Sequence, residues 1–321
     1  MVIIQNRLII DNYSNFVKFS LSKYIWFDGK LVTLNMAKVP VTTHAIHYGT
    51  SVFEGIRAYW NPKNLYIFRL KDHIKRFRNS GKFYNITLNF SDKQIENAVI
   101  DLCRKNKIKK SCYIRPFYFV GQYGINLHVT KKAPTHTVIF AFPFGDLFNK
   151  NGITATISKW RKFNDTSTPT QAKMGGNYLN SILATQDAKQ KGFDEAVLLD
   201  QSGNVSEAPG ENIFLIKNDI MITPSLSSSA LDGITRKSII TIAKDMNLKI
   251  KIQKVSKKEL KLADEVFLSG TAAEITPIIK IDKKKIGDGK VGNITKLFMD
   301  TYSDIVMNNN KNYSNWLTKV Y

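Results

Sequence analysis

Apolar and polar residues alternate in several short stretches of this 321-residue chain. Such alternation predicts β-strands, because successive side chains of a strand point to opposite faces. Residues 24–41 are expected to form two strands around a turn at Asp28-Gly29. Stretches 112–121 and 137–142 have the same character. The second half adds hairpins at 196–208 and 212–223, the latter turning at Asn218-Asp219, and a strand followed by a glycine turn at 264–278.

The stretch 112–121 (CYIRPFYFVG) has two features of its own. Pro116 has no amide hydrogen to donate, so we expect this strand to lie at an edge or a bulge of its sheet. Tyr113 and Arg115 are two positions apart and therefore share one face of the strand. A hydroxyl and a guanidinium are thus predicted side by side.

Other segments repeat their apolar residues every three or four positions, which predicts amphipathic helices. Ser91 with Gln94 three residues later is the sequence of a capping box, which marks a helix start. The helix after Ser91 would bury Ile95, Ala98, Val99 and Leu102. The other predicted helices are 72–84, 177–191 with an apolar face of Leu179, Ile182, Leu183 and Ala184, 234–246, and 293–307.

Strands and helices are mixed along the chain and do not alternate regularly, which favours an α+β fold. The loop-like sequence PFGDLFNK at 143–150 is the expected linker between two domains. We therefore predict a small domain at 24–142 and a larger one at 151–321. Residues 1–23 form an extension, either a weak transit peptide or an overlong gene start.

The net charge of +21 invites a nucleic-acid function, but the lysines are spread along the chain and do not form one stripe or tail. A Lys-, Asn- and Ile-rich composition is typical of a biased genome, so we expect no nucleic-acid partner. No apolar run reaches the roughly 18 residues of a membrane span. Cys103 and Cys112 do not form a disulfide framework, which favours a reducing, cytoplasmic location, with an organelle left open by the extension.

Several residues could carry chemistry. Lys173 precedes Gly175-Gly176, and a lysine with a lowered pKa can act as a nucleophile that forms a Schiff base. Glu207 lies on a turn, where a carboxylate could face a buried cation. DGITR (232–236) and SGTAA (269–273) offer backbone amides to an anion. The residues alone leave open whether these are functional or ordinary surface features.

His44 and His47 lack further ligands nearby in the sequence, so we expect hydrogen bonding or packing and no metal. A lysine, an acid and two anion sites together suit a phosphorylated aldehyde held covalently. Pyridoxal 5'-phosphate requires such a set.

The sequence resembles a known family over the range from about Tyr24 to beyond Ile279. HYGTSVFEGIRAY (47–59), YIRPFYFVG, KMGGNYLNSILATQDA, VSEAPGENIFLIK, SSALDGITR and SGTAAEITP occur in the order and spacing of the branched-chain amino-acid aminotransferases. These are fold-type IV pyridoxal-phosphate enzymes. The resemblance implies a smaller N-terminal domain, a larger pseudo-barrel-like C-terminal domain, and a site between them.

The resemblance also implies roles for single residues. Lys173 matches the lysine that binds the cofactor covalently and later moves the substrate proton. Tyr178 matches the tyrosine that contacts the phenolic oxygen of the cofactor, and Glu207 the acid that pairs with its ring nitrogen. The remaining matches are the phosphate ligands Arg76, Ile234, Thr235, Gly270 and Thr271.

The implied reaction is reversible transfer of the amino group of L-leucine, L-isoleucine or L-valine to 2-oxoglutarate. The residues that match the substrate pocket are Tyr48, Phe53, Tyr113, Arg115, Thr271 and Ala272. Arg115 and Tyr48 match the groups that receive the distal carboxylate of glutamate. Loop 121–127 resembles the segment that closes the neighbouring subunit's site, which implies a homodimer or a larger homo-oligomer.

Two positions depart from the family pattern. Pro209 replaces a small residue after Glu207 and stiffens that turn, and VGQYGINL (120–127) is bulkier than glycine-rich versions of its loop. The second departure affects side-chain preference and not the reaction. A D-amino-acid aminotransferase and an aminodeoxychorismate lyase share the lysine and the glutamate, and remain the alternatives.

Overall fold

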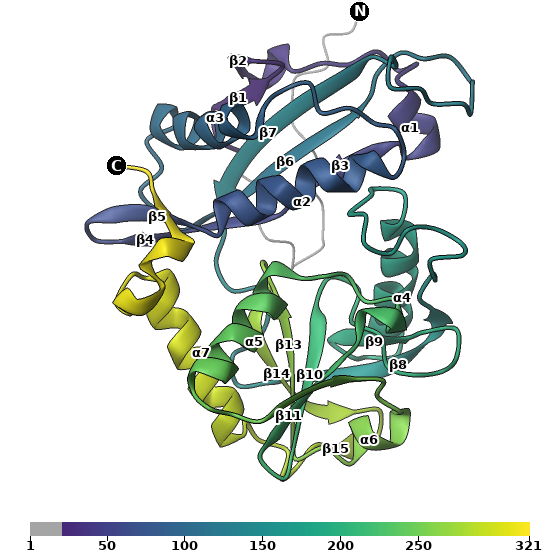
Figure 1. The fold of residues 1–321 in the computed structure, drawn as a ribbon, viewed down its shortest axis with the longest axis vertical. Helices are drawn as coiled ribbons and strands as arrows, with labels where there is room; N and C mark the ends of the chain where they lie inside the picture. The colour runs from purple at the N-terminus through teal and green to yellow at the C-terminus, as the bar shows by residue number, and fades with distance from the viewer. Residues whose placement is uncertain (1–20) are drawn as a thin grey trace, which may run out of the picture.

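The computed structural model describes residues 21–321, and its first sheet occupies the upper part of Figure 1. The strands of this sheet are β1 (Tyr24–Phe27), β2 (Lys30–Thr33), β3 (Ser51–Phe53), β4 (Ile56–Asn61), β5 (Asn64–Phe68), β6 (Cys112–Val120), β7 (Thr135–Pro143) and β16 (Leu317–Lys319). Their order is β16-β5-β4-β6-β7-β1-β2, with β3 paired to β6. All of these pairs are antiparallel.

The second sheet occupies the lower part of Figure 1 and mixes parallel and antiparallel pairs. Its strands are β8 (Ile153–Arg161), β9 (Glu195–Leu199), β10 (Asn212–Lys217), β11 (Ile220–Pro224), β12 (Ile250–Gln253), β13 (Glu265–Gly270), β14 (Glu274–Ile281) and β15 (Lys284–Lys285). Their order is β12-β11-β10-β13-β14-β8-β9, with β15 paired to β14.

Seven α-helices pack on the two sheets of the described chain: α1 (His44–Tyr48), α2 (Leu70–Lys82), α3 (Asp92–Lys105), α4 (Tyr178–Gln190), α5 (Ile234–Asp245), α6 (Lys257–Lys261) and α7 (Asn293–Val306). Short 3-10 helices cover Leu34–Met36, Leu226–Ser228 and Lys311–Trp316. This mixture confirms the predicted α+β class. The capping box is also confirmed: the amide of Gln94 donates to Ser91 Oγ, and the Gln94 side chain accepts from the Ser91 amide at 2.8 Å.

The predicted position of strand β6 at an edge or a bulge is wrong, because β6 lies between β4 and β7 and its pairings with β3, β4 and β7 have no register shift. Pro116 is tolerated there because the neighbouring chain is interrupted opposite it, at Glu54 and Gly55 between β3 and β4. The Glu54 amide still donates to the Pro116 carbonyl at 2.8 Å. In an antiparallel pair the two groups of one residue point to the same side, so the missing N–H falls at this interruption.

The predicted buried face of helix α4 is also wrong. Leu179, Ile182 and Leu183 are 66%, 50% and 38% exposed, whereas Ala184 is buried as expected. The face that packs on β8 and β9 is formed by small and polar residues, because the helix approaches the strands closely. Its buried residues are Asn180, Ser181, Ala184, Asp187 and Ala188.

Separate hydrophobic clusters lie against the two sheets. Ile74, Phe77 and Leu102 belong to the cluster of the first sheet, and Phe214, Phe267 and Phe298 lie between the second sheet and helix α7. Strand β16 returns the end of the chain to the first sheet, a feature that the sequence pattern did not predict. The proposed domain limits at 24–142, 143–150 and 151–321 stay predictions. Most of the extension 1–23 lies outside the described residues.

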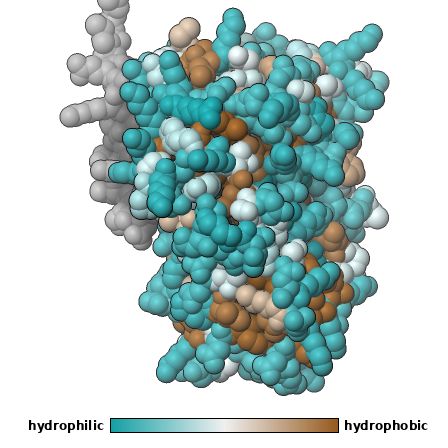
Figure 2. All heavy atoms as spheres, turned by 60° about the vertical axis from the view of Figure 1, so that its left-hand side comes forward, coloured by the Kyte–Doolittle hydropathy of each residue, from teal (hydrophilic) through white to brown (hydrophobic). Residues whose placement is uncertain are grey.

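The face shown in Figure 2 is mostly hydrophilic, with hydrophobic residues visible in separate groups. Within residues 21–321, none of the helices has both the length and the apolar character that crossing a membrane requires.

Candidate active site

A cleft with about 200 Å³ of interior space is lined by residues of both sheets. Twelve of the thirteen site residues proposed from the sequence line it, although they come from segments far apart in the chain. From the first half these are Phe53, Arg76, Tyr113 and Arg115, and from the second half Lys173, Tyr178, Glu207, Ile234, Thr235, Gly270, Thr271 and Ala272.

Lys173 lies in the loop before α4, and two glycines hold this loop against β3. The Gly175 amide donates to the Ser51 carbonyl at 2.7 Å, and the Gly176 amide donates to the Gly49 carbonyl at 3.2 Å. A Cβ on Gly175 would be 2.2 Å from Ser51 Oγ, so only glycine allows this approach without displacement. The glycines next to Lys173 therefore serve close backbone packing.

The amine of Lys173 is enclosed by aromatic groups. Its Nζ donates to the Tyr178 hydroxyl at 2.5 Å and lies 4.8 Å from the centre of the Phe53 ring. Burial and the nearby Arg76 guanidinium lower the pKa of Lys173 to about 8. Burial also raises the pKa of Tyr178 to about 12, so its hydroxyl keeps its proton. Lys173 thus has a substantial neutral fraction near physiological pH, as a nucleophile requires.

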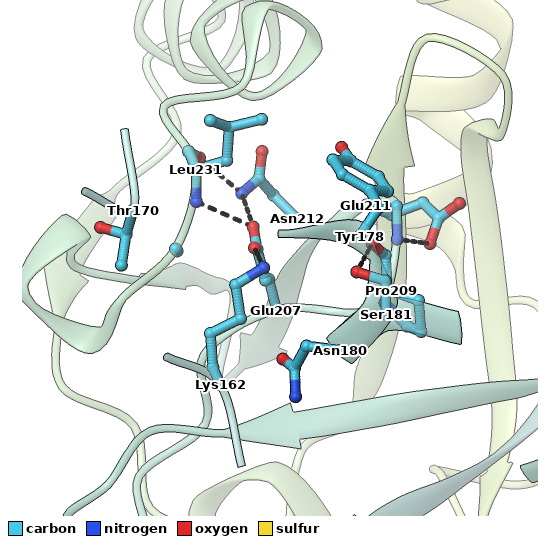
Figure 3. Close-up of polar contacts among 12 residues, drawn as sticks. Lys162, Thr170, Tyr178, Asn180, Ser181, Glu207, Pro209, Glu211, Asn212 and Leu231 are labelled. Atoms are coloured by element: carbon cyan, nitrogen blue, oxygen red, sulfur yellow. Dashed lines mark hydrogen bonds and ion pairs between the residues drawn. The ribbon is translucent and has the colours of Figure 1, made fainter. Parts of the chain in front are cut away.

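The carboxylate of Glu207 is buried and contacted on both oxygens (Figure 3). Oε2 accepts from the Leu231 amide at 2.9 Å and from Asn212 Nδ2 at 3.2 Å. Oε1 lies 2.6 Å from Lys162 Nζ. The turn after Glu207 is fixed to α4, because Ser181 Oγ donates to the Pro209 carbonyl at 2.8 Å. Pro209 therefore fits the turn that holds this acid.

The guanidinium of Arg76 on α2 is held by a buried acid. Arg76 Nε and Nη2 donate to the two oxygens of Glu54 at 2.6 and 2.9 Å, and Arg76 Nη1 donates to the Asp232 carbonyl at 3.2 Å. His73 Nδ1 lies 2.7 Å from Glu54 Oε2. Burial opposes charge on Glu54, but Arg76 and His73 outweigh it and lower the pKa of Glu54. The Arg76 guanidinium is thereby held in one orientation at the cleft.

Two backbone segments that the sequence suggested as anion sites lie at the cleft. Helix α5 begins at Ile234 after Gly233, no side chain caps it, and Gly233, Ile234 and Thr235 line the cleft. Amides at a helix N-terminus attract anions. The turn between β13 and β14 brings Gly270 and Thr271 to the same cleft.

The side chains of Tyr113 and Arg115 lie on one face of β6, as predicted. Arg115 Nη2 donates to the Tyr113 hydroxyl at 3.1 Å, and the guanidinium lies 4.7 Å from the centre of the Phe53 ring. Arg115 Nε is buried and has no hydrogen-bond partner within the described residues. One wall of the cleft is therefore aromatic and carries a cation that can still accept an anionic partner.

Tyr48 is the one proposed site residue that does not line the cleft of this chain. Its side chain is 42% exposed and its hydroxyl donates to the Ile125 carbonyl at 3.2 Å. Nearby His44 hydrogen-bonds Thr50 through Nδ1, in keeping with the hydrogen-bonding role expected from the sequence. Among residues 21–321 no group of acidic, histidine or cysteine residues suits a metal ion.

Sequence reasoning missed several residues that shape the site. Lys162 pairs with Glu207, and Glu54 and His73 hold Arg76. Lys162 is one of many lysines, and only its contact distinguishes it. The FEGIR sequence was noted, but nothing in its spacing indicated that Glu54 would be fully buried.

Comparison with known proteins places this geometry in a family. A family model described as amino-transferase class IV matches residues 51–281. The branched-chain-amino-acid aminotransferase of Salmonella typhimurium is 41% identical over 301 residues, which are 92% of this chain and 97% of that protein. The chain belongs to the class IV aminotransferases.

Solved structures of class IV aminotransferases have the same fold. The branched-chain aminotransferase of Thermoproteus uzoniensis, solved with norvaline, is 40% identical with a TM-score of 0.91, covering 94% of this chain and 100% of that one. The branched-chain amino acid aminotransferase of Thermobaculum terrenum, solved in its PLP form, is 34% identical with a TM-score of 0.89, covering 94% and 99%. These likenesses confirm the fold expected from the sequence resemblance.

Proposed function

We propose that this class IV aminotransferase transfers the amino group of L-leucine, L-isoleucine or L-valine reversibly to 2-oxoglutarate, with pyridoxal 5'-phosphate as cofactor. The observation that carries the proposal is the buried amine of Lys173, with its pKa lowered to about 8, in one cleft with Glu207 and Arg76. The names and cofactor of its relatives support the same reading.

The residues of the cleft fit this cofactor. The segment 231–235 runs between the two charged groups, since the Leu231 amide contacts Glu207 and the Asp232 carbonyl contacts Arg76. Arg76, the N-terminus of α5 at Ile234 and Thr235, and the Gly270-Thr271 turn would hold the phosphate. Glu207 would face the ring nitrogen, and Tyr178 the phenolic oxygen.

When bound, the cofactor supplies an electron sink for the bond broken at the substrate α-carbon. The chain supplies the acid–base groups. Lys173 in its neutral form accepts the α-proton, and the Tyr178 hydroxyl, 2.5 Å from Nζ, orients the amine. An ionised Glu207 favours a protonated ring nitrogen, because opposite charges stabilise each other in a buried site.

The substrate side of the cleft can accept both the branched-chain substrate and 2-oxoglutarate. Phe53 and the ring of Tyr113 offer apolar surface to a branched side chain, while the Arg115 guanidinium lies over Phe53 at the cleft and would bind a distal carboxylate. Thr271 and Ala272 would receive the α-carboxylate. The aromatic rings would partly stabilise the positive charge of Arg115 when an apolar substrate is bound and no carboxylate pairs with it.

We also propose that the chain works as a homodimer in which Tyr48 and loop 121–127 complete the neighbouring subunit's site. Tyr48 is outside its own cleft and contacts this loop, and Ile125 and Leu127 are 82% and 77% exposed. Large apolar side chains exposed together commonly mark an interface. We further propose a cytoplasmic location, in keeping with the free, buried cysteines Cys103 and Cys112.

The test of the reaction is a coupled assay of the purified chain with pyridoxal 5'-phosphate, 2-oxoglutarate and each amino donor. Formation of L-glutamate is expected with L-leucine, L-isoleucine and L-valine. The variant Lys173→Ala is expected to form none. Turnover with D-alanine and not with L-leucine would move the function to a D-amino-acid aminotransferase.

A further inference from the structure

Three buried carboxyl groups lie at or next to the cleft: Glu207 and Glu211 line it, and Glu195 on β9 is near enough to Glu211 to repel it when ionised. Their residues are 4%, 7% and 6% exposed, in that order. Three negative charges in this buried region would repel each other, so we do not expect all three carboxyls to be ionised at the same time. The hydrogen-bond donors around each carboxyl indicate which of the three is ionised.

Glu207 has the richest set of donors (Figure 3). An amide hydrogen of Leu231 and the side-chain amide of Asn212 both point at Oε2. The ammonium of Lys162 reaches Oε1 from the opposite side at 2.6 Å. Hydrogen bonds and a cation that contact the charged form favour that form.

Glu211 and Glu195 have much poorer surroundings. Glu211 accepts from the Gly210 amide at 3.2 Å, and Glu195 accepts from the Ala196 amide at 2.7 Å. In the described part of the chain, neither carboxyl has a cationic side chain within ion-pair distance. Burial, reinforced by repulsion from Glu195, raises the pKa of Glu211 to about 8, and burial raises the pKa of Glu195 to about 7.

Lys162 is itself fixed in place. It follows strand β8, its amide donates to the Leu199 carbonyl at 2.8 Å, and its side chain is 17% exposed. Burial favours the neutral amine, but Glu207 outweighs this effect and raises the pKa of Lys162. The other cations of the cleft contact other groups: Lys173 contacts Tyr178, Arg76 contacts Glu54, and Arg115 contacts Tyr113.

We propose that Lys162 is a positioning residue that selects Glu207, among three buried carboxyls, as the one that carries the negative charge. It does so by supplying the cation that the other two carboxyls lack, and it orients Oε1 at the same time. Glu211 and Glu195 are expected to be mostly protonated at pH 6.

This inference deepens the proposed function, because an ionised Glu207 is the group that the ring nitrogen of the cofactor would face. Its test uses no substrate and no turnover. A failed transamination assay therefore leaves the charge assignment standing, and a wrong charge assignment leaves transamination standing.

The first experiment is infrared difference spectroscopy of the full chain at pH 6, where protonated and ionised carboxyls absorb at different frequencies. Glu211→Gln is expected to remove a protonated-carboxyl signal, and Glu207→Gln a carboxylate signal. The opposite assignment would overturn the proposal. This comparison leaves Lys162 unchanged, so it does not depend on how a Lys162 variant folds.

The second experiment changes the cation. Lys162→Met is expected to gain one protonated carboxyl per chain, which disappears when Glu207→Gln is added, whereas Lys162→Arg keeps the wild-type spectrum. Lys280→Met is the matched control, because Lys280 lies on β14 of the same sheet, its side chain is exposed, and it forms no ion pair with a carboxyl of the described residues. An unchanged Lys162→Met spectrum, or a gained signal that survives Glu207→Gln, would contradict the role of Lys162.

Discussion

The pKa of Lys173 makes a quantitative prediction about its reactivity. The amine is buried beside Arg76, and both effects favour the neutral form, which lowers its pKa to about 8. A lysine in a peptide titrates near about 10.4. Changing the pH therefore changes the nucleophilic fraction of Lys173 in a range where surface lysines stay fully protonated.

The size of the effect follows from these two values. At pH 7, an amine with a pKa of about 8 is neutral in about one molecule in ten, and one with a pKa of about 10.4 in about one in 2,500. Lys173 should thus have about 200 times the neutral fraction of an ordinary lysine. Its reactivity should rise through about pH 8 and then level off, while that of surface lysines continues to rise.

The assay is reductive methylation with formaldehyde of the cofactor-free full chain at a series of pH values, followed by mass spectrometry of the peptides. The rate for Lys173 is normalised to its own plateau, so limited access to the cleft does not affect the midpoint. Surface lysines in the same digest provide the comparison. A Lys173 midpoint close to theirs would refute the argument that burial and Arg76 activate this amine.

Three further predictions concern single side chains. Glu207→Gln should slow each half-reaction by about a hundredfold, the scale of a lost electrostatic stabiliser, while the affinity for pyridoxal 5'-phosphate changes far less. Unchanged half-reaction rates in stopped flow would mean that another acid has this role. Arg115→Ala should raise the KM for 2-oxoglutarate by about tenfold or more, as expected for a lost charged hydrogen bond, and should raise the KM for 4-methyl-2-oxopentanoate much less. Equal increases in the two KM values would contradict the selective role of Arg115. A Cβ on Gly55 would be 1.8 Å from the Tyr113 hydroxyl, so Gly55→Ala should displace the Tyr113 ring and raise the KM for both oxo acids. Kinetics equal to those of the wild type would show that the ring has room to move.

The sequence predicted most helices and strands because their spacing is strong, as for the capped helix α3 and the hairpin of β10 and β11. It failed where tertiary context overrides local preference. Pro116 lies inside a sheet because its neighbour is interrupted at that point. Helix α4 buries small and polar residues and exposes Leu179 and Ile182, which no rule based on one chain's periodicity anticipates.

The candidate site likewise contains residues that the sequence indicated and residues that only the folded structure reveals. Lys173 and Glu207 were proposed as site residues from the order of the family motifs, and the structure brings both to one cleft. Residues that act through another side chain have no such signature. Lys162 is 45 positions from Glu207, and Glu54 is 22 from Arg76, so only folding brings these ion pairs together.

The most direct test of the proposed function is the absorption spectrum of the purified chain with pyridoxal 5'-phosphate, recorded before and after addition of L-leucine. We expect a visible band from the cofactor bound to Lys173, which L-leucine converts to the band of the amine form and 2-oxoglutarate restores. Lys173→Ala should lack the initial band. A bound cofactor that L-leucine leaves unchanged would contradict the account.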